Sequence, residues 1–66
     1  MQITVNGEPL EIDDGSTLPA VLAMLGLEGK PCAVEVNAAV VPKAEHDSCT
    51  IHAGDVIEIV TLVGGG

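Results

Sequence analysis

The architecture is set by residues 56–63, which read Val56-Ile57-Glu58-Ile59-Val60-Thr61-Leu62-Val63 and are apolar at six of eight positions. A continuous apolar run of this length is typical of a strand that is buried on both faces at the centre of a sheet. A turn-forming segment, Ala53-Gly54-Asp55, directly precedes the run. We therefore expect the last strand to lie in the middle of the sheet, with the rest of the chain built around it.

The first twelve residues predict a β-hairpin. Apolar and polar side chains alternate on both sides of Asn6-Gly7, a dipeptide that accommodates the positive φ angles of a tight turn. The alternation places the apolar side chains of both strands together: Met1, Ile3 and Val5 on the first, and Leu10 and Ile12 opposite them. We expect this hairpin to lie against the last strand.

A helix is predicted over about residues 18–25. Its apolar face has the spacing i, i+3, i+4, i+7 and consists of Leu18, Val21, Leu22 and Leu25. Thr17 is the expected N-cap, and Pro19 is tolerated in the first turn because its missing N–H has no partner within the helix there. Gly26 followed by Leu27 predicts a left-handed stop with a hydrophobic contact.

The second half of the chain predicts two more strands before the last one. Residues 33–37 alternate again, and residues 40–41 offer a short partner strand before Pro42. The resulting order is β-β-α-β-β-β, with the first and last strands parallel and the helix crossing one face of a mixed sheet. This is the β-grasp arrangement, an α+β fold.

Length and composition limit the chain to one small domain. It has 66 residues, no aromatic side chain and 47% hydrophobic content, so its core consists of Val, Ile, Leu, Ala and Met. Such a core leaves little space for a ligand cavity of about 300 Å³ or more. An enzyme with an enclosed pocket is not expected.

Charge excludes some partners and favours others. Ten acidic residues against Lys30 and Lys43 give a net charge of −8, which disfavours binding to nucleic acid or to an anionic membrane. The same charge would attract a basic protein surface, or it would serve solubility alone. From the sequence we expect neither a signal peptide nor a membrane anchor.

The cysteines and histidines carry no assigned role. Cys32 and Cys49 are too far apart for a CxxC motif and are expected to be reduced structural residues of a cytoplasmic protein, with a sulfur relay as the alternative. His46 and His52 lack a third ligand at a suitable spacing, so no metal is expected.

Gly64-Gly65-Gly66 follows the strongest strand. Residues 64–66 have no side chains to pack, so we expect a flexible tail after a folded body of residues 1–63. The tail is either a frayed end without function or a chemical handle thin enough for a narrow active-site channel. In the second case the Gly66 carboxylate is the reactive group, and an activating enzyme would convert it with ATP into an acyl adenylate that a sulfur nucleophile attacks.

Several segments together resemble the ThiS family, the sulfur carriers of thiamine biosynthesis. The resemblance covers nearly the whole chain in order and length. It is carried by Ile3-Thr4-Val5-Asn6-Gly7-Glu8, Ala33-Val34-Glu35-Val36-Asn37, Val40-Val41-Pro42, Gly54-Asp55-Val56-Ile57-Glu58-Ile59-Val60 and Gly64-Gly65-Gly66. The sequence departs from the family at His46 and Leu62, where an aromatic residue is common.

The resemblance implies a ubiquitin-like β-grasp protein that is a cosubstrate and not an enzyme. It implies that Gly66, with Gly65 as the other half of the required pair, is adenylated by an E1-like (ThiF-like) adenylyltransferase. It also implies a thiocarboxylate formed with sulfur from a cysteine desulfurase and donated to a thiazole synthase (ThiG-like). No cofactor is expected on the carrier itself, since ATP is used by the activating enzyme.

Partner docking is expected near the tail, on a chain that is monomeric when free. The candidate residues are Val60, Leu62, Val63 and Gly64, with Glu58 facing a basic rim. A strand exposes only alternate positions, so some of these belong to the core, and the sequence does not fix which. Two other functions remain open: the small subunit of molybdopterin synthase or another sulfur carrier, and a noncatalytic ubiquitin-like modifier or interaction domain.

Overall fold

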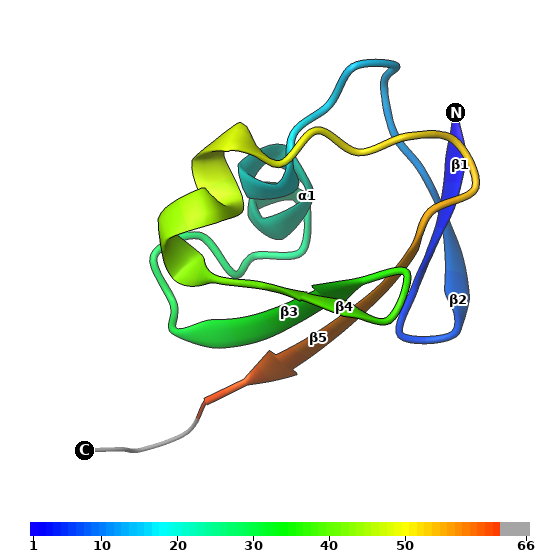
Figure 1. The fold of residues 1–66 in the computed structure, drawn as a ribbon. Helices are drawn as coiled ribbons and strands as arrows, with labels where there is room; N and C mark the ends of the chain where they lie inside the picture. The colour runs from blue at the N-terminus through cyan, green and yellow to red at the C-terminus, as the bar shows by residue number, and fades with distance from the viewer. Residues whose placement is uncertain (63–66) are drawn as a thin grey trace.

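The computed structural model describes residues 1–62 and has five strands in one mixed sheet (Figure 1). The elements are β1 (Gln2–Val5), β2 (Glu8–Glu11), α1 (Leu18–Met24), β3 (Cys32–Val36), β4 (Ala39–Val41), the 3₁₀ helix η1 (Lys43–Ser48) and β5 (Val56–Thr61). The strand order is β2-β1-β5-β3-β4, with β5 parallel to β1 and antiparallel to β3. This confirms the β-grasp prediction and the central position of the last strand.

The prediction that β5 is buried on both faces is wrong, because the strand is buried on one face only. Ile57 and Ile59 are buried, whereas Val56, Glu58 and Val60 are exposed. The reason is that α1 and η1 both lie on the same side of the sheet and leave the other side uncovered (Figure 1). The strand also ends at Thr61, and Val63 lies outside the described residues.

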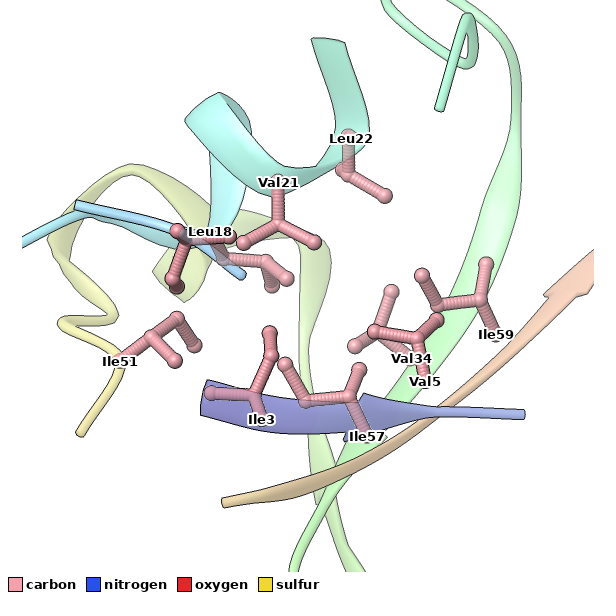
Figure 2. Packing of buried hydrophobic residues seen from close by; sticks show 10 residues of the cluster. Ile3, Val5, Leu18, Val21, Leu22, Val34, Ile51, Ile57 and Ile59 are labelled. Carbon is pink, nitrogen blue, oxygen red and sulfur yellow. The ribbon is translucent and has the colours of Figure 1, made fainter. Parts of the chain in front are cut away.

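The core forms between α1 and the covered face of the sheet. Figure 2 shows Leu18, Val21 and Leu22 of α1 pointing toward the strands. The buried residues are Ile3, Val5, Ile12, Leu18, Val21, Leu22, Val34, Ile51, Ile57 and Ile59. All ten are Ile, Val or Leu, which confirms an aliphatic core, although Ala and Met, which the sequence also predicted there, are not among them.

The end of α1 is the left-handed stop that the sequence predicts. Gly26 has a φ of +73°, and the Leu27 N–H donates to the Leu22 carbonyl at 2.9 Å, the long bond of a Schellman motif. Leu25 is wrongly predicted as part of the buried face. It follows the last helical residue, Met24, and is 39% exposed.

The start of α1 depends on a distant segment and not on a side-chain cap. Thr17 is the N-cap residue, but its side chain makes no capping hydrogen bond. Instead the Leu18 N–H donates to the Cys49 carbonyl at 2.8 Å, and the Ile51 N–H donates to the Ser16 carbonyl at 2.8 Å. The chain after η1 therefore holds the helix in place over the sheet.

Two asparagines fix β5 between its neighbours. The Asn6 amide donates to the Ile59 carbonyl at 3.1 Å, and the Ile59 N–H donates to Asn6 Oδ1 at 2.7 Å. At the start of the strand, the Val56 N–H donates to Asn37 Oδ1 at 2.9 Å, and the Asn37 N–H donates to the Val56 carbonyl at 2.7 Å. Both asparagines occupy hairpin turns with positive φ, so the turns and the central strand are one hydrogen-bonded unit.

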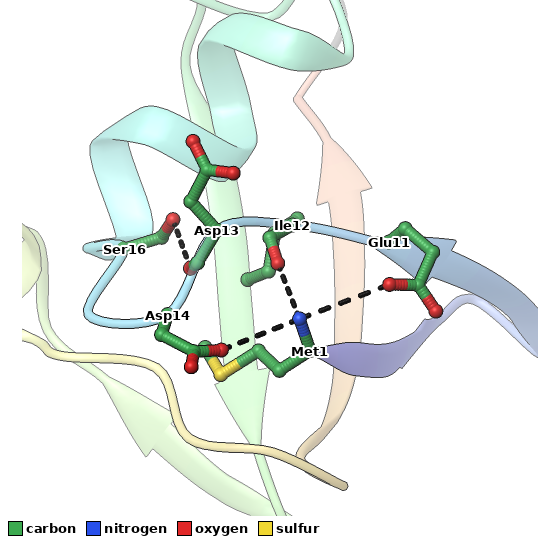
Figure 3. A network of polar contacts seen from close by, with 6 residues as sticks. All are labelled: Met1, Glu11, Ile12, Asp13, Asp14 and Ser16. Carbon is green, nitrogen blue, oxygen red and sulfur yellow. Dashed lines mark hydrogen bonds and ion pairs between the residues drawn. The ribbon is translucent and has the colours of Figure 1, made fainter.

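The N-terminal ammonium group closes the edge of the first hairpin (Figure 3). It donates to the Ile12 carbonyl at 2.7 Å and lies 3.4 Å from Asp14 and 3.7 Å from Glu11. Because both carboxylates are largely exposed, their ion pairs add little, and the bond to Ile12 is the main contact.

Among residues 1–62, no helix has the length and apolar character that a membrane crossing requires.

Candidate functional site

The residue that follows β5, on the way to the terminal glycines, is held by a backbone hydrogen bond. The Leu62 N–H donates to the Pro31 carbonyl at 3.0 Å, which continues the β3–β5 pairing by one contact beyond Thr61. The described chain stops at this point. Val63, Gly64, Gly65 and Gly66 lie outside the described residues, so their predicted roles in docking and chemistry stay predictions.

The structure settles which side of β5 faces solvent. Val60 is 62% exposed and Leu62 is 55% exposed, and Glu58 is exposed as well. These three predicted docking residues are at alternate positions, opposite in direction to the buried Ile57 and Ile59. The structure therefore leaves all three accessible to a partner on the uncovered side of the sheet.

Three further residues belong to the same surface and were missed. Directly opposed residues of an antiparallel pair share a face. Ala33 is opposite Val60, Glu35 is opposite Glu58, and Val40 is opposite Glu35. We call the five residues Ala33, Glu35, Val40, Glu58 and Val60 the open face. The alternation of residues 33–37 could have indicated Ala33 and Glu35, since it places Val34 and Val36 on the core side.

The open face combines apolar side chains with an uncompensated pair of charges. Val40 is 70% exposed and Val60 is 62% exposed. Glu35 and Glu58 are opposite each other on neighbouring strands, and neither forms an ion pair within residues 1–62. Like charges placed directly opposite destabilise a sheet. A cationic side chain docked between them would relieve that repulsion, so the open face suits an apolar partner surface with a basic group.

The cysteines form no disulfide in the described chain. Both are free thiols and half-buried. Burial raises the pKa of the Cys49 thiol above its usual value of 9.0, and the nearby negative charges of Asp55 and Glu45 raise it further. A raised pKa keeps the thiol protonated and weakly nucleophilic near neutral pH.

The histidines have local structural contacts. His46 Nε2 lies 3.1 Å from the Val41 carbonyl, to which it can donate, and His52 Nδ1 lies 3.9 Å from the Asp55 carboxylate. In the part of the chain that the structure describes, no three His, Cys, Asp or Glu side chains are grouped closely enough to hold a metal ion.

Two surface pockets are larger than the composition led us to expect. Each has a volume of about 350 Å³. One lies between α1, η1 and the loop before β3, and the other lies beside the first hairpin and the end of α1. Both are open hollows between elements and not enclosed cavities, because a single short helix cannot cover the whole sheet.

Comparison with known proteins assigns the chain to a family. A family model described as the ThiS family matches residues 3–66. The sulfur carrier protein ThiS of Thermus thermophilus is 38% identical over 64 residues, which cover 97% of this chain and 98% of that protein. A thiazole synthase of Paramagnetospirillum magneticum is 36% identical over 66 residues.

The coverage of the thiazole synthases is partial. The chain spans only about a fifth of their length, since the match covers 20% of the Paramagnetospirillum protein and 20% of a thiazole synthase of Magnetococcus marinus.

A solved structure supports the fold independently. The crystal structure of the thiamine biosynthesis protein ThiS from Geobacter metallireducens aligns over the full length of both chains, with a TM-score of 0.82 and 30% sequence identity. With its family match and its β-grasp fold, the chain belongs to the ThiS family.

Proposed function

We propose that this protein is the sulfur carrier of thiamine biosynthesis, with the Gly66 carboxylate as its reactive group. The observation that carries the proposal is the end-to-end similarity to the Thermus thermophilus sulfur carrier. The protein is a carrier and not a catalyst, so its activity depends on the enzymes that it meets. The partial match to thiazole synthases agrees with a thiazole synthase as the acceptor.

The chemistry begins with activation of a poor electrophile. In the proposed first step a Gly66 carboxylate oxygen attacks the α-phosphorus of ATP in an E1-like enzyme, and pyrophosphate leaves. Sulfide then attacks the acyl carbon, and the bond between that carbon and the AMP oxygen breaks. The products are AMP and a thiocarboxylate, and the acyl carbon keeps its oxidation state throughout. The proposed source of the sulfur is the cysteine persulfide of a cysteine desulfurase. A thiol reductant releases this sulfur as sulfide, and the two electrons come from oxidation of two thiols to a disulfide.

The proposed division of labour separates residues 1–63 as a folded body from residues 64–66 as the reacting segment. Ordering three glycines in an enzyme channel costs roughly 3 to 6 kcal/mol. The segment offers no side-chain contacts to offset this cost. Affinity for each enzyme must therefore come from the body, and the open face with Leu62 beside it is the surface that we assign to docking.

The docking chemistry follows from the residues of the open face. Val40 and Val60 would be covered by apolar partner side chains, while Glu35 and Glu58 would receive a lysine or arginine. Exposed charges contribute mainly to the rate of encounter and are screened by salt. We expect association with the activating enzyme to slow as ionic strength increases.

Exchange of labelled pyrophosphate into ATP tests the proposed first step. The E1-like enzyme of the same organism should catalyse exchange only when the intact chain is present. A chain that lacks Gly66 should not support exchange, although it should fold normally. A chain with one alanine added after Gly66 serves as a second control, because the added methyl group blocks a channel that admits only glycine. Exchange that proceeds equally with either altered chain would contradict the proposal.

A further inference from the structure

The pocket between α1, η1 and the loop before β3 contains both lysines of the protein. Lys30 and Lys43 are 13 positions apart in the sequence, and the chain has no arginine. Lys30 lies in the loop, and Lys43 is the first residue of η1. The fold nevertheless brings both to the lining of one pocket of about 350 Å³. This convergence has no part in the proposed sulfur chemistry.

The backbone that carries each lysine is held by hydrogen bonds. The Lys30 N–H donates to the Leu27 carbonyl at 3.0 Å, and the Glu45 N–H donates to the Pro42 carbonyl at 2.8 Å at the start of η1. Two of the elements that line the pocket, α1 and η1, are in direct contact. The backbone positions of both lysines are therefore set by the fold.

The pocket is electrostatically different from the rest of the molecule. Glu28 and Asp47 also line it, so two positive and two negative side chains give a formal charge of zero when His46 is neutral. The whole chain carries −8, and all of this excess lies outside the pocket. Neither lysine forms an ion pair with an acidic side chain among residues 1–62, which leaves both ammonium groups available to a ligand.

Part of the remaining lining is aliphatic. Leu22 is buried, Leu27 is half-buried, and Pro19 completes an aliphatic surface between the two lysines' elements. A ligand with a short hydrocarbon body can cover this surface, and one with a negative group can reach the ammonium ions. The acidic side chains in the lining favour a monoanion over a phosphate dianion, because repulsion increases with ligand charge.

We propose that this pocket binds a carboxylate carried on a short aliphatic body, with Lys30 and Lys43 contacting the carboxylate. The ligand is either a free short-chain acid or a glutamate within an apolar segment of a partner protein, and both present the same chemistry. The site is separate from the open face, which lies on the uncovered side of the sheet. Its existence does not depend on the sulfur-carrier function.

Nuclear magnetic resonance titration of the ¹⁵N-labelled intact chain with hexanoate tests the proposal. Hexanoate should give saturable shifts at Leu22, Leu27 and Lys30. Hexanol tests the apolar contact alone, hexylammonium reverses the charge, and inorganic phosphate tests anion binding without a hydrocarbon body. We expect hexanoate to bind more tightly than all three, and to bind more weakly in 0.5 M salt than in dilute buffer.

Matched variants separate the lysines from net charge. Lys30→Gln and Lys43→Gln should each raise the dissociation constant of hexanoate about two- to fivefold, the range expected of an exposed ion pair. Gln2→Glu makes the same change in net charge at an exposed β1 position outside the pocket and should have a much smaller effect. Unchanged spectra away from the pocket show that each variant is folded.

A peptide ligand distinguishes the two possible sources of the carboxylate, a free acid and a segment of a partner protein. The peptide acetyl-Leu-Glu-Leu-amide should bind more tightly than hexanoate if the natural ligand is a partner segment, and more weakly if it is a free acid, while acetyl-Leu-Gln-Leu-amide should not bind. Equal shifts with hexanoate and hexanol, or full affinity in the Lys30→Gln/Lys43→Gln double variant, would overturn the proposal. Either result would leave the pyrophosphate-exchange test of the sulfur carrier unaffected.

Discussion

Asn6 links a turn to the central strand through its side chain. Its amide makes two hydrogen bonds to the backbone of Ile59, at 2.7 and 3.1 Å, where β1 has already ended. The side chain thus takes the place of a strand residue and satisfies two backbone groups of β5 that would otherwise lack partners.

Asn6→Ala should lower the free energy of unfolding by about 2 to 3 kcal/mol, because it leaves two partly buried backbone groups unpaired and places alanine at a positive φ. Urea denaturation followed by far-ultraviolet circular dichroism measures the change. Asn6→Gly keeps the turn geometry and removes only the amide, so it isolates the hydrogen bonds. A glycine variant as stable as the natural protein would show that the two bonds contribute nothing.

Glu35 is expected to lower the stability of the isolated protein and to strengthen its binding to a partner. Its side chain lies opposite Glu58, so Glu35→Gln should stabilise the isolated protein by a few tenths of a kcal/mol up to about 1 kcal/mol. The same change should weaken association with the activating enzyme. Thermal unfolding and titration calorimetry measure the two effects.

Glu8→Gln is the matched control for Glu35→Gln. Glu8 is exposed on β2 and lies opposite Val5, so its charge has no repulsive partner across the strand. We expect little change in its thermal midpoint or in partner binding. If Glu35→Gln and Glu8→Gln weaken binding equally, the effect is one of net charge and the open face is not the docking surface.

At the level of elements, the end of α1 is determined by backbone conformation. A Cβ atom added at Gly26 would meet no atom within 4 Å, so a substitution there has no steric clash with the rest of the protein. Gly26→Ala should still destabilise the fold by about 1 kcal/mol, because φ is +73°. Gly26→Asn should cost less, since asparagine tolerates this conformation. Equal stability of all three proteins in urea would mean that the helix end has rearranged.

Local signals explain which elements could be predicted from the sequence. Asn6-Gly7 and Gly26 fix their own backbone conformations, so the first hairpin and the end of α1 follow from a few adjacent residues. The exposure of Val60 and Leu25 was harder to predict, because it depends on how much of the sheet one short helix covers. Apolar side chains on β5 suggested burial on both faces, whereas one face is open and available for docking.

The pairings between distant segments could not be predicted. Glu35 and Glu58 are neighbours only because β3 lies antiparallel to β5 in one register, and Lys30 and Lys43 share a pocket only because η1 packs on α1. Neither the alternation of a strand nor the charge of a loop contains this information. The sequence therefore indicated only some of the residues of each candidate surface, and the fold was needed to identify the others.

For the whole molecule, we assign the stability of the fold to residues 1–63 and the chemical reactivity to residues 64–66. A chain that lacks Gly65 and Gly66 should have a thermal midpoint within about 1 °C of that of the intact protein, since these residues bury no side chain. The same chain should be inactive as a sulfur acceptor. A truncation that unfolds the domain would mean that the terminal glycines contribute to the fold.

The central claim is that sulfur is carried at the Gly66 carboxylate. The most direct measurement is the intact mass of the protein after incubation with ATP, a sulfur donor and the E1-like enzyme, followed by fragmentation to locate the modification. Replacement of one oxygen by sulfur predicts a gain of about 16 Da at Gly66. A gain of about 32 Da at Cys32 or Cys49, which indicates a persulfide, or no gain with an active enzyme, would contradict the claim.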